Sequence, residues 1–566
     1  MKRFTSSLAA ILALSCAALL PTPAGGRSAG GAQGAGDGNG TTGRVDAIFA
    51  EWDRQDSPGC ALGVYRNGAI AYARGYGMAD VERHVPIAPH TVFDIGSTSK
   101  QFSAAAIVLL QQDGRLTLDD SVRNWVPDLP PYAAPITIRH MLLHTSGLRD
   151  YIGLLTLAGV SIDSVTDADD ALRIIARQKA LNFEPGAEQL YSNSGYFLLS
   201  VIVERASGKT LQAFARERIF APLGMTRTHY LGSYDDVVPD RALAYEPRPN
   251  GGLRLDVSRW LQVGDGAVFT TVEELLQWDN NFYEPRVGGD ALPAALRAPG
   301  SLANGTALDY ALGLGIGTYR GQRTVSHGGS WGGYRAELLR FPDQRFSVAT
   351  LCNLGSINPT RLARRVADVY LEDVLAPVDT ADAGGGAPVH VPADVLAGYA
   401  GTYRNAVTRT RLVVALGDGR LTVSGDGRFE LRPRSAAVFH AAGTPVTWTF
   451  DASGRGHPSR VTRQREGREP EVFEKVAPLK LTARDLAAYG GRFYSEELDA
   501  TFTLAVEDGA LTLRRRGART QRLVPVVADE FMAGSMTVRI TRGPDGAVAG
   551  YLLDIGRVRN LLFERH

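Results

Sequence analysis

The chain has 566 residues, of which 44% are hydrophobic and 21% are charged, and its formal net charge is +1. Because this length exceeds what one hydrophobic core organises, we expect two to four domains. The composition is that of an ordinary globular protein and provides no sustained positive field for phosphates, which argues against nucleic acid as a partner.

The first 24 residues predict a secretory signal peptide. Lys2 and Arg3 precede an apolar run over residues 8–20, and small residues near Ala24 suit a cleavage site. The run is too short to span a bilayer as a helix. We therefore expect cleavage after Ala24 and export to the periplasm or the medium.

Residues 25–43 predict a flexible tether, because the segment GGRSAGGAQGAGDGNGTTG is rich in glycine and poor in apolar side chains. No later stretch has eighteen or more uninterrupted apolar residues, so no transmembrane span is expected.

Three cysteines are present. Lipid attachment at Cys16 is disfavoured because Leu14 is bulky at a position where small residues are expected. Once the signal is removed, Cys60 and Cys352 remain, each in an apolar strand-like run. A disulfide and two free buried thiols both fit this pattern.

Residues 44–375 predict an α+β domain. Strand-like runs at 61–73 and 345–351 bracket helical patterns that include 98–112 and 195–205. Strands at both ends with helices between them are typical of the α+β class.

Two copies of one small domain follow a linker. The linker, residues 376–392, is dominated by Pro, Gly and Ala. Residues 393–478 and 479–566 repeat each other at an offset of about 90 residues. The repeated positions include Leu396, Tyr399 and Gly401, which recur as Leu486, Tyr489 and Gly491. Short strands joined by Asp-Gly turns predict a small antiparallel lipocalin-like β-barrel for each copy.

A candidate nucleophile lies in the segment FDIGSTSKQF. Ser97 stands just before a helical pattern and Lys100 follows one helical turn later. A serine hydroxyl needs a base to take its proton, and a lysine amine can do this when burial and neighbours keep it uncharged. Taken alone, the pair also fits a helix-capping Ser and a surface Lys.

Two further segments supply candidate site residues. In FEPGAEQLYSNSGY, Tyr191 and Asn193 lie on a loop before a helical pattern, which suits a phenol and an amide directed into a cleft. In TVSHGGSWGGY, a glycine-rich strand edge allows close approach of a substrate backbone. The candidate substrate-binding residues are Asn193, His327, Gly328, Gly329 and Ser330.

Together the three segments resemble the Ser-x-x-Lys, Tyr-x-Asn and Lys/His-x-Gly motifs of the serine β-lactamase and penicillin-binding family, especially its class C-like branch. The resemblance covers residues 44–375. It implies a β-lactamase-like fold, in which helices flank an antiparallel sheet beside an all-helical lobe. It also implies that Ser97 is acylated, that Lys100 is its base partner, and that Tyr191 passes the proton to the leaving group and activates the deacylating water.

The resemblance further implies that Asn193 holds the substrate amide and that the backbone N–H groups of Ser97 and Ser330 form an oxyanion hole. His327 stands where many family members have Lys, and a mostly uncharged imidazole anchors a substrate carboxylate less well. The His-x-Gly form followed by two barrels resembles the D-stereospecific aminopeptidases and related amidases and esterases of this family. In those enzymes a loop of the last domain reaches the active site.

Two competing motifs are less favoured. The segment Gly328–Gly332 matches a Gly-x-Ser-x-Gly elbow, but that elbow needs a following helix, and the sequence after it predicts two strands. His140 and His144 have the spacing of a zinc-binding helix, but the residue where Glu is expected is Met141, which favours packing over metal binding. We expect no metal and no cofactor.

Three functional classes remain. The favoured class is an exported serine hydrolase that acts on a small peptide, amide or ester through a Ser97 acyl-enzyme, most like a D-aminopeptidase or esterase. A penicillin-recognising enzyme, either a β-lactamase or a DD-carboxypeptidase, is disfavoured by His327. An inactive binding protein has no chemical need for the four motif residues together. The sequence predicts neither the oligomeric state nor the physiological substrate.

Overall fold

The computed structural model describes residues 38–377, 389–406, 408, 410–425, 428–441, 446–451, 458–465, 469–477 and 479–566. The predicted signal peptide, most of the predicted tether and most of the linker lie outside these residues. None of the described helices is both long and apolar enough to cross a membrane.

A six-stranded antiparallel sheet organises the first domain, in the order β10-β11-β12-β13-β1-β2. Its strands are β10 (Gly315–Tyr319), β11 (Gln322–Trp331), β12 (Tyr334–Phe341), β13 (Phe346–Cys352), β1 (Cys60–Arg66) and β2 (Ala69–Tyr76). Strands from the two ends of the domain pair with each other, with Ala61 opposite Leu351. The sheet therefore joins the N-terminal and C-terminal parts of this domain.

The expectation of one continuous strand over residues 61–73 is wrong. The segment folds into the hairpin β1–β2, in which Asn67 has φ 51° and Gly68 has φ 83°. A two-residue hairpin turn needs left-handed backbone at both central positions, and Asn-Gly adopts this at low cost.

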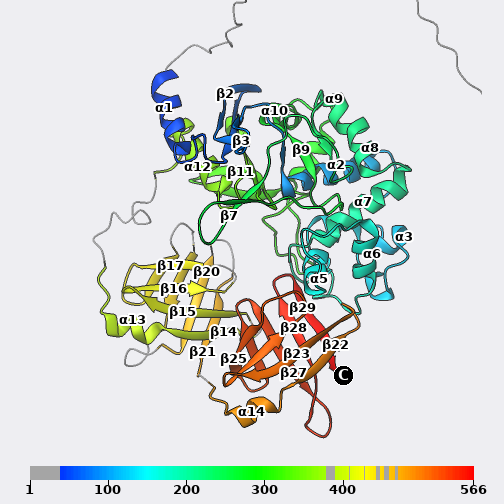
Figure 1. Cartoon of the computed structure of the whole chain (residues 1–566). Coiled ribbons are helices and arrows are strands. Elements are labelled where there is room, and N and C mark those ends of the chain that lie inside the picture. Colours follow the sequence, from blue (N-terminus) through cyan, green and yellow to red (C-terminus); the bar gives the residue numbers. More distant parts are fainter. Residues whose placement is uncertain are drawn as a thin grey trace, which may run out of the picture. The chain divides into compact units, whose positions relative to one another are not determined.

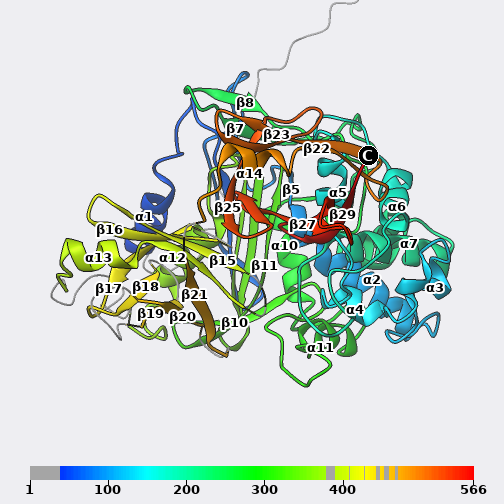
Figure 2. The ribbon, with the colours of Figure 1, turned by 90° about the horizontal axis from the view of Figure 1, so that it is seen from below.

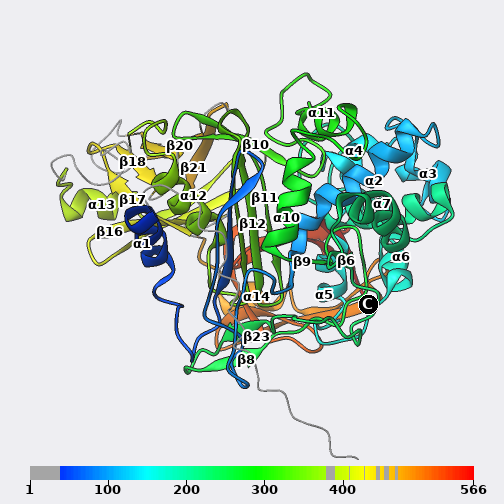
Figure 3. The same cartoon turned by 90° about the horizontal axis from the view of Figure 1, so that it is seen from above.

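Helices cover both faces of the sheet, as Figure 3 shows. Helices α1 (Gly38–Phe49) and α12 (Pro359–Tyr370) pack on the face that carries Leu62 and Val64, whereas α10 (Val272–Asn280) packs on the opposite face. This alternation is the period-two pattern of a strand buried on both sides. Helix α1 begins at Gly38, so the prediction that the tether extends to residue 43 is wrong. Later residues of this helix pack on the sheet, and that packing also stabilises the first turns of the helix.

An all-helical lobe gathers around α2 and α7 (Figure 2). Its helices, with α11, are α2 (Lys100–Gln112), α3 (Val122–Trp125), α4 (Ile138–Leu142), α5 (Tyr151–Leu157), α6 (Ala168–Ala176), α7 (Asn193–Ser207), α8 (Leu211–Ala215), α9 (Ala221–Leu223) and α11 (Ala291–Arg297). Every residue of α2 from 100 to 110 is buried, so this helix is the centre of the lobe. The sequence placed α2 and α7 to within about two residues at each end.

Short strands connect the lobe to the sheet. They are β3 (Met78–Asp80), β4 (Val85–Pro86), β5 (Phe93–Asp94), β6 (His229–Tyr230), β7 (Tyr245–Pro247), β8 (Leu253–Leu255) and β9 (Val268–Thr270). The small sheet β5-β9-β6 ends immediately before the turn that carries Ser97, and so fixes where that turn begins.

Two closed eight-stranded antiparallel barrels follow (Figure 1). The first barrel comprises β14 (Gly401–Arg404), β15 (Arg411–Gly417), β16 (Arg420–Ser424), β17 (Arg428–Pro433), β18 (Val438–Ala441), β19 (Val446–Phe450), β20 (Arg460–Arg465) and β21 (Glu471–Val476). The second comprises β22 (Gly491–Ser495), β23 (Ala500–Glu507), β24 (Ala510–Arg514), β25 (Gln521–Val527), β26 (Glu530–Ala533), β27 (Met536–Arg542), β28 (Val548–Ile555) and β29 (Val558–Arg565). A short helix precedes each barrel, α13 (Ala393–Tyr399) and α14 (Ala483–Ala487). The repeated sequence therefore forms two copies of one fold, as expected.

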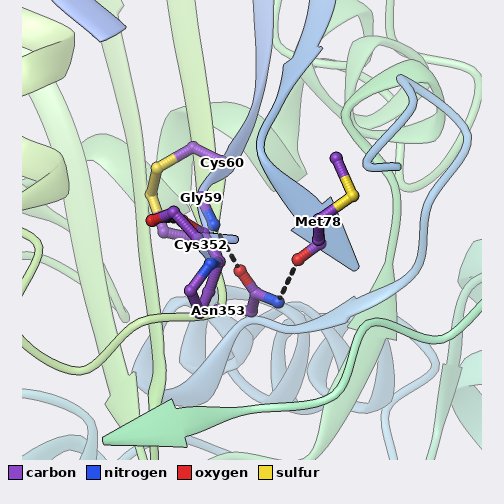
Figure 4. Close-up of a disulfide and its surroundings, with 7 residues drawn as sticks. Gly59, Cys60, Met78, Cys352 and Asn353 are labelled. Atoms are coloured by element: carbon purple, nitrogen blue, oxygen red, sulfur yellow. Dashed lines mark hydrogen bonds between the residues drawn. A yellow bond between two sulfur atoms is a disulfide. The ribbon is translucent and has the colours of Figure 1, made fainter. Parts of the chain in front are cut away.

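The open question of the two remaining cysteines is settled by a disulfide between Cys60 and Cys352 (Figure 4). The two residues lie opposite each other on β1 and β13. Next to the bridge, the Asn353 side chain accepts a hydrogen bond from the Gly59 N–H and donates one to the Met78 carbonyl. The covalent link and this amide together join the first and last strands of the domain.

Candidate active site

Ser97 lies in a 3-10 turn, η1 (Gly96–Ser99), that leads directly into α2. The Gly96 N–H donates to Asp94 Oδ1 at 2.7 Å, which holds the start of the turn. Gly96 has φ 48°, and a Cβ on it would lie 2.7 Å from the Ser330 backbone nitrogen. Glycine at this position therefore lets the Ser97 turn and β11 meet backbone to backbone.

The Lys100 amine lies beside the Ser97 hydroxyl. Its Nζ is fully buried and donates to Ser97 Oγ at 3.1 Å, to Asn193 Oδ1 at 2.9 Å and to the Asp265 carbonyl at 2.5 Å. All three partners accept hydrogen bonds, so the amine is held in one orientation toward the serine. The surface-lysine alternative for this motif is therefore excluded.

The Tyr191 hydroxyl is buried, and within the described part of the chain it has no hydrogen-bond partner. Its ring lies between the imidazole of His144, 4.1 Å away between ring centroids, and the Lys100 Nζ, 4.9 Å from the ring centroid. A buried polar group without a partner is costly, and such groups concentrate at functional sites. The unpartnered phenol therefore remains the predicted proton carrier for the Ser97 reaction.

Asn193 is the first residue of α7, and Asp150 holds it. The backbone N–H and the side-chain Nδ2 of Asn193 both donate to Asp150 Oδ2, at 2.8 and 2.9 Å. Since Asn193 Oδ1 accepts from Lys100, both ends of the amide are fixed. The predicted substrate-binding amide is thus preorganised by a carboxylate that the motifs did not reveal.

His327, on β11, is the last side chain in a series of hydrogen bonds that runs through His144 and Tyr310. The Ser192 N–H donates to His144 Nδ1 at 3.1 Å, so His144 carries its proton on Nε2, which lies 3.2 Å from the Tyr310 hydroxyl. Tyr310 in turn donates to His327 Nε2 at 2.9 Å, and His327 Nδ1 donates to the Gly328 carbonyl at 2.7 Å. These partners assign one tautomer to each imidazole.

Burial and the neighbouring Lys100 cation lower the pKa of His327 from 6.5 to about 4. Burial, followed by the same cation, also holds the pKa of His144 well below its ordinary value. Both imidazoles are therefore uncharged at neutral pH. The third motif presents a neutral hydrogen-bonding group where Lys would present a charge.

The competing motifs are resolved by the same geometry. Ser330 lies inside β11 and is followed by the strand β12, so the strand-to-helix context of a nucleophile elbow is missing, as expected. Helix α4 ends at Leu142, and His144 lies beyond it with φ 59°, so His140 and His144 do not share a helical face. Gly328 and Gly329 lie on the same stretch of β11, where a Cβ on Gly329 would lie 1.8 Å from the Ile95 carbonyl oxygen.

A cleft of about 830 Å³ contains the site and is lined by both polar and apolar side chains. The predicted residues that line it are Ser97, Tyr191, Asn193, His327, Gly328, Gly329 and Ser330. Asp150 and Arg557 line it as well, and Arg557 belongs to the β28–β29 hairpin of the second barrel. The cleft is large enough for a ligand of several residues' size.

Residues 45–372 match the Beta-lactamase family. The chain belongs to this family. It is a serine hydrolase of the family, and the Lys100 Nζ lies 3.1 Å from the hydroxyl of Ser97, the nucleophile that the motifs predict.

Two curated relatives illustrate its neighbours in sequence. The D-aminopeptidase of Cereibacter sphaeroides (strain ATCC 17029 / ATH 2.4.9) is 28% identical over 528 residues, which cover 90% of this chain and 96% of that protein. Penicillin-binding protein 4* of Bacillus subtilis (strain 168) is 32% identical over 308 residues, which cover 50% of this chain and 66% of that protein.

Solved structures share the fold. The octameric penicillin-binding protein homologue from Pyrococcus abyssi aligns with a TM-score of 0.56 at 22% identity, over 76% of this chain and all of that chain (100%). The D-amino acid amidase from Ochrobactrum anthropi SV3, complexed with L-phenylalanine amide, aligns with a TM-score of 0.50 at 23% identity, over 59% of this chain and 99% of that chain.

Several residues of this β-lactamase-family site were missed by sequence reasoning. They are Asp150, Asp265, His144, Tyr310 and Arg557. Tyr310 and Arg557 lie in no motif, and tertiary packing alone brings them to the cleft.

Proposed function

We propose that the protein is an exported serine hydrolase that cleaves amide bonds of small peptides or amino-acid amides, most like a D-stereospecific aminopeptidase or amidase. The observation that carries this proposal is the contact of the buried Lys100 Nζ with Ser97 Oγ at 3.1 Å. The names of the D-aminopeptidase relative and of the amidase neighbour support the substrate class. Export rests on the signal-like sequence of residues 1–24.

The reaction begins with attack of Ser97 Oγ on the substrate carbonyl carbon, and the base that accepts the hydroxyl proton is the uncharged form of Lys100, in which a nitrogen lone pair replaces the N–H directed at Ser97 Oγ. Tyr191 then passes a proton to the leaving amine, and in the second half-reaction it takes one from the water that attacks the acyl-enzyme. The backbone N–H groups of Ser97 and Ser330 stabilise the oxyanion in both steps. The close approach of Gly96 to Ser330 supports this assignment, because it brings the two segments together.

The neutral imidazole of His327 favours this function over penicillin recognition. The resemblance implies that β-lactamases and carboxypeptidases of this family usually carry Lys in the third motif, where its charge anchors a substrate carboxylate. Here burial keeps His327 uncharged, and its Nε2 already accepts a hydrogen bond from Tyr310. The third motif therefore offers no charge to a carboxylate beside it.

Turnover of matched substrates tests this proposal. The purified protein is assayed with D-alanine amide, L-alanine amide, a short-chain ester and penicillin G. The proposal expects amide or ester turnover with a preference for the D-enantiomer. Penicillin turnover, or a stable penicilloyl adduct without amide turnover, would instead assign the protein to the penicillin-recognising enzymes.

A further inference from the structure

The tip of the β28–β29 hairpin is anchored at the cleft by its backbone. The Arg557 carbonyl accepts a hydrogen bond from Asn182 Nδ2 at 2.9 Å and one from the Asp150 N–H at 3.4 Å. The Arg559 N–H donates to Asn182 Oδ1 at 2.8 Å. Because these bonds use main-chain atoms of the hairpin, its position does not depend on the Arg557 side chain.

The Arg557 guanidinium faces the catalytic residues. Its central carbon lies 4.5 Å from the centroid of the Tyr191 ring, and one of its nitrogens lies 3.6 Å from Asp150 Oδ2. The side chain is 44% exposed and lines the cleft. Within the described part of the chain the guanidinium donates no hydrogen bond to protein, so its N–H groups are available to a ligand.

The nearby carboxylate of Asp150 is buried and its oxygens are occupied by protein donors. Asp150 Oδ1 accepts from the Gly153 N–H at 3.2 Å, and Oδ2 accepts from both nitrogens of Asn193. The Asp150 side chain is only 5% exposed. A ligand entering this side of the cleft therefore contacts the exposed Arg557 guanidinium rather than the buried carboxylate that pairs with it.

We propose that Arg557 selects substrates whose acyl part carries a carboxylate, such as an acidic side chain next to the scissile bond. This inference rests on the proposed function. The acyl side is assigned because Asn193, the predicted partner of the substrate amide, shares Asp150 with Arg557. A guanidinium binds a carboxylate through two parallel N–H bonds, and this geometry discriminates strongly against a neutral isostere.

A pair of substrates that are matched in shape but differ in charge tests the proposal. D-Glutamic acid α-(p-nitroanilide) and D-glutamine p-nitroanilide differ only in the charge of the side chain. We expect kcat/KM to favour the glutamate substrate by at least about tenfold, as one charge-assisted hydrogen bond contributes. In Arg557→Gln the preference should fall to within about twofold through loss of the glutamate rate, and in Arg557→Lys it should persist in part.

Arg559→Gln is the matched control. Arg559 lies two residues along the same hairpin, and its guanidinium pairs with Glu188. This variant removes one positive charge from the hairpin without changing the cleft lining, so the glutamate preference should remain. If both variants lose the glutamate preference equally, the overall positive charge of the barrel determines that preference, and the role of Arg557 is overturned.

Binding can be measured without turnover. D-Glutamic acid α-amide and D-glutamine amide are compared for their ability to protect Ser97 from labelling by a fluorophosphonate. We expect the glutamate compound to protect at a concentration at least about tenfold lower. Equal protection, or tighter binding of the glutamine compound, overturns the inference while labelling of Ser97 leaves the proposed function standing. Absence of any labelling removes the proposed function and the inference together.

Discussion

The two C-terminal barrels have the same topology but different relations to the hydrolase domain. The buried side chains of the second barrel belong to the apolar cluster that also contains the hydrolase core, whereas those of the first barrel form a cluster of their own. At an offset of 90 residues, the counterparts of Glu497 and Arg557 in the first copy are Val407 and Gly467. The repeat thus supplies a scaffold, and a few side chains of one copy adapt it to the active site.

Removal of the second barrel should have the largest effect. A chain that ends at Lys480 keeps the first barrel but loses the hairpin that anchors Asn182 and Asp150. Since misplacement of about 1 Å can cost a hundredfold in rate, we expect amide turnover to fall by at least about a hundredfold. If the soluble truncated protein retains turnover within tenfold of that of the full chain, the second barrel is not needed to position the active site.

Glu497→Ala tests the interface without deleting a domain. Glu497 forms an ion pair with Arg149 in which both side chains are almost fully buried, and Arg149 also donates to the Arg559 and Asn560 carbonyls. Removing one partner leaves a buried charge unpaired, so we expect a loss of about 3–5 kcal/mol in the free energy of unfolding, measured by urea denaturation.

Glu430→Ala in the first barrel is the matched control for this prediction. Glu430 pairs with Arg420 on the barrel surface, where both side chains are at least 36% exposed. A solvent-screened pair contributes little, so this substitution should cost less than about 1 kcal/mol. Similar losses in the two variants would remove the energetic distinction between the barrels.

The part of the cleft lined by the neutral imidazole of His327 contrasts with the charged side contributed by Arg557 of the second barrel. Folding lowers the pKa of His327 from 6.5 to about 4, so between these pH values the unfolded chain binds the proton more tightly. The contribution of His327 to stability is therefore present above pH 6.5 and is lost as the pH falls toward 4.

His327→Gln isolates this effect. The amide can still accept from Tyr310 but does not titrate, and the acidic groups of the site titrate alike in both proteins. The free energy of unfolding is measured for both proteins at pH 7 and at pH 4. The value for the wild type minus the value for the variant should be about 3 kcal/mol smaller at pH 4 than at pH 7. A difference that stays constant with pH would show that His327 titrates normally and would weaken its role as a neutral group.

Local patterns predicted much of the fold and of the candidate site. The Ser97–Lys100 spacing predicted a contact that the helix start provides, and the 90-residue repeat predicted two barrels. The roles assigned to the motif residues remain predictions. The Asn67-Gly68 pair is typical of a hairpin turn, but the apolar residues on both sides of it led to a single strand-like run being predicted over 61–73.

The rest could not be read from local patterns, because it depends on packing between distant segments. Tyr310 bridges His144 and His327 from a stretch with no recognisable motif, and Arg557 reaches Tyr191 from 366 residues along the chain. The resemblance predicted that some loop of the last domain would approach the site, but no pattern indicated which loop. A single sequence specifies such contacts only through the complete fold.

Mass spectrometry of the intact protein after reaction with a fluorophosphonate tests the central claim most directly. We expect one adduct, located on Ser97 by peptide mapping. In Ser97→Ala this adduct should be absent, and amide turnover should fall by at least about a thousandfold. Undiminished labelling or turnover in Ser97→Ala would contradict the account, because another residue would then be the nucleophile.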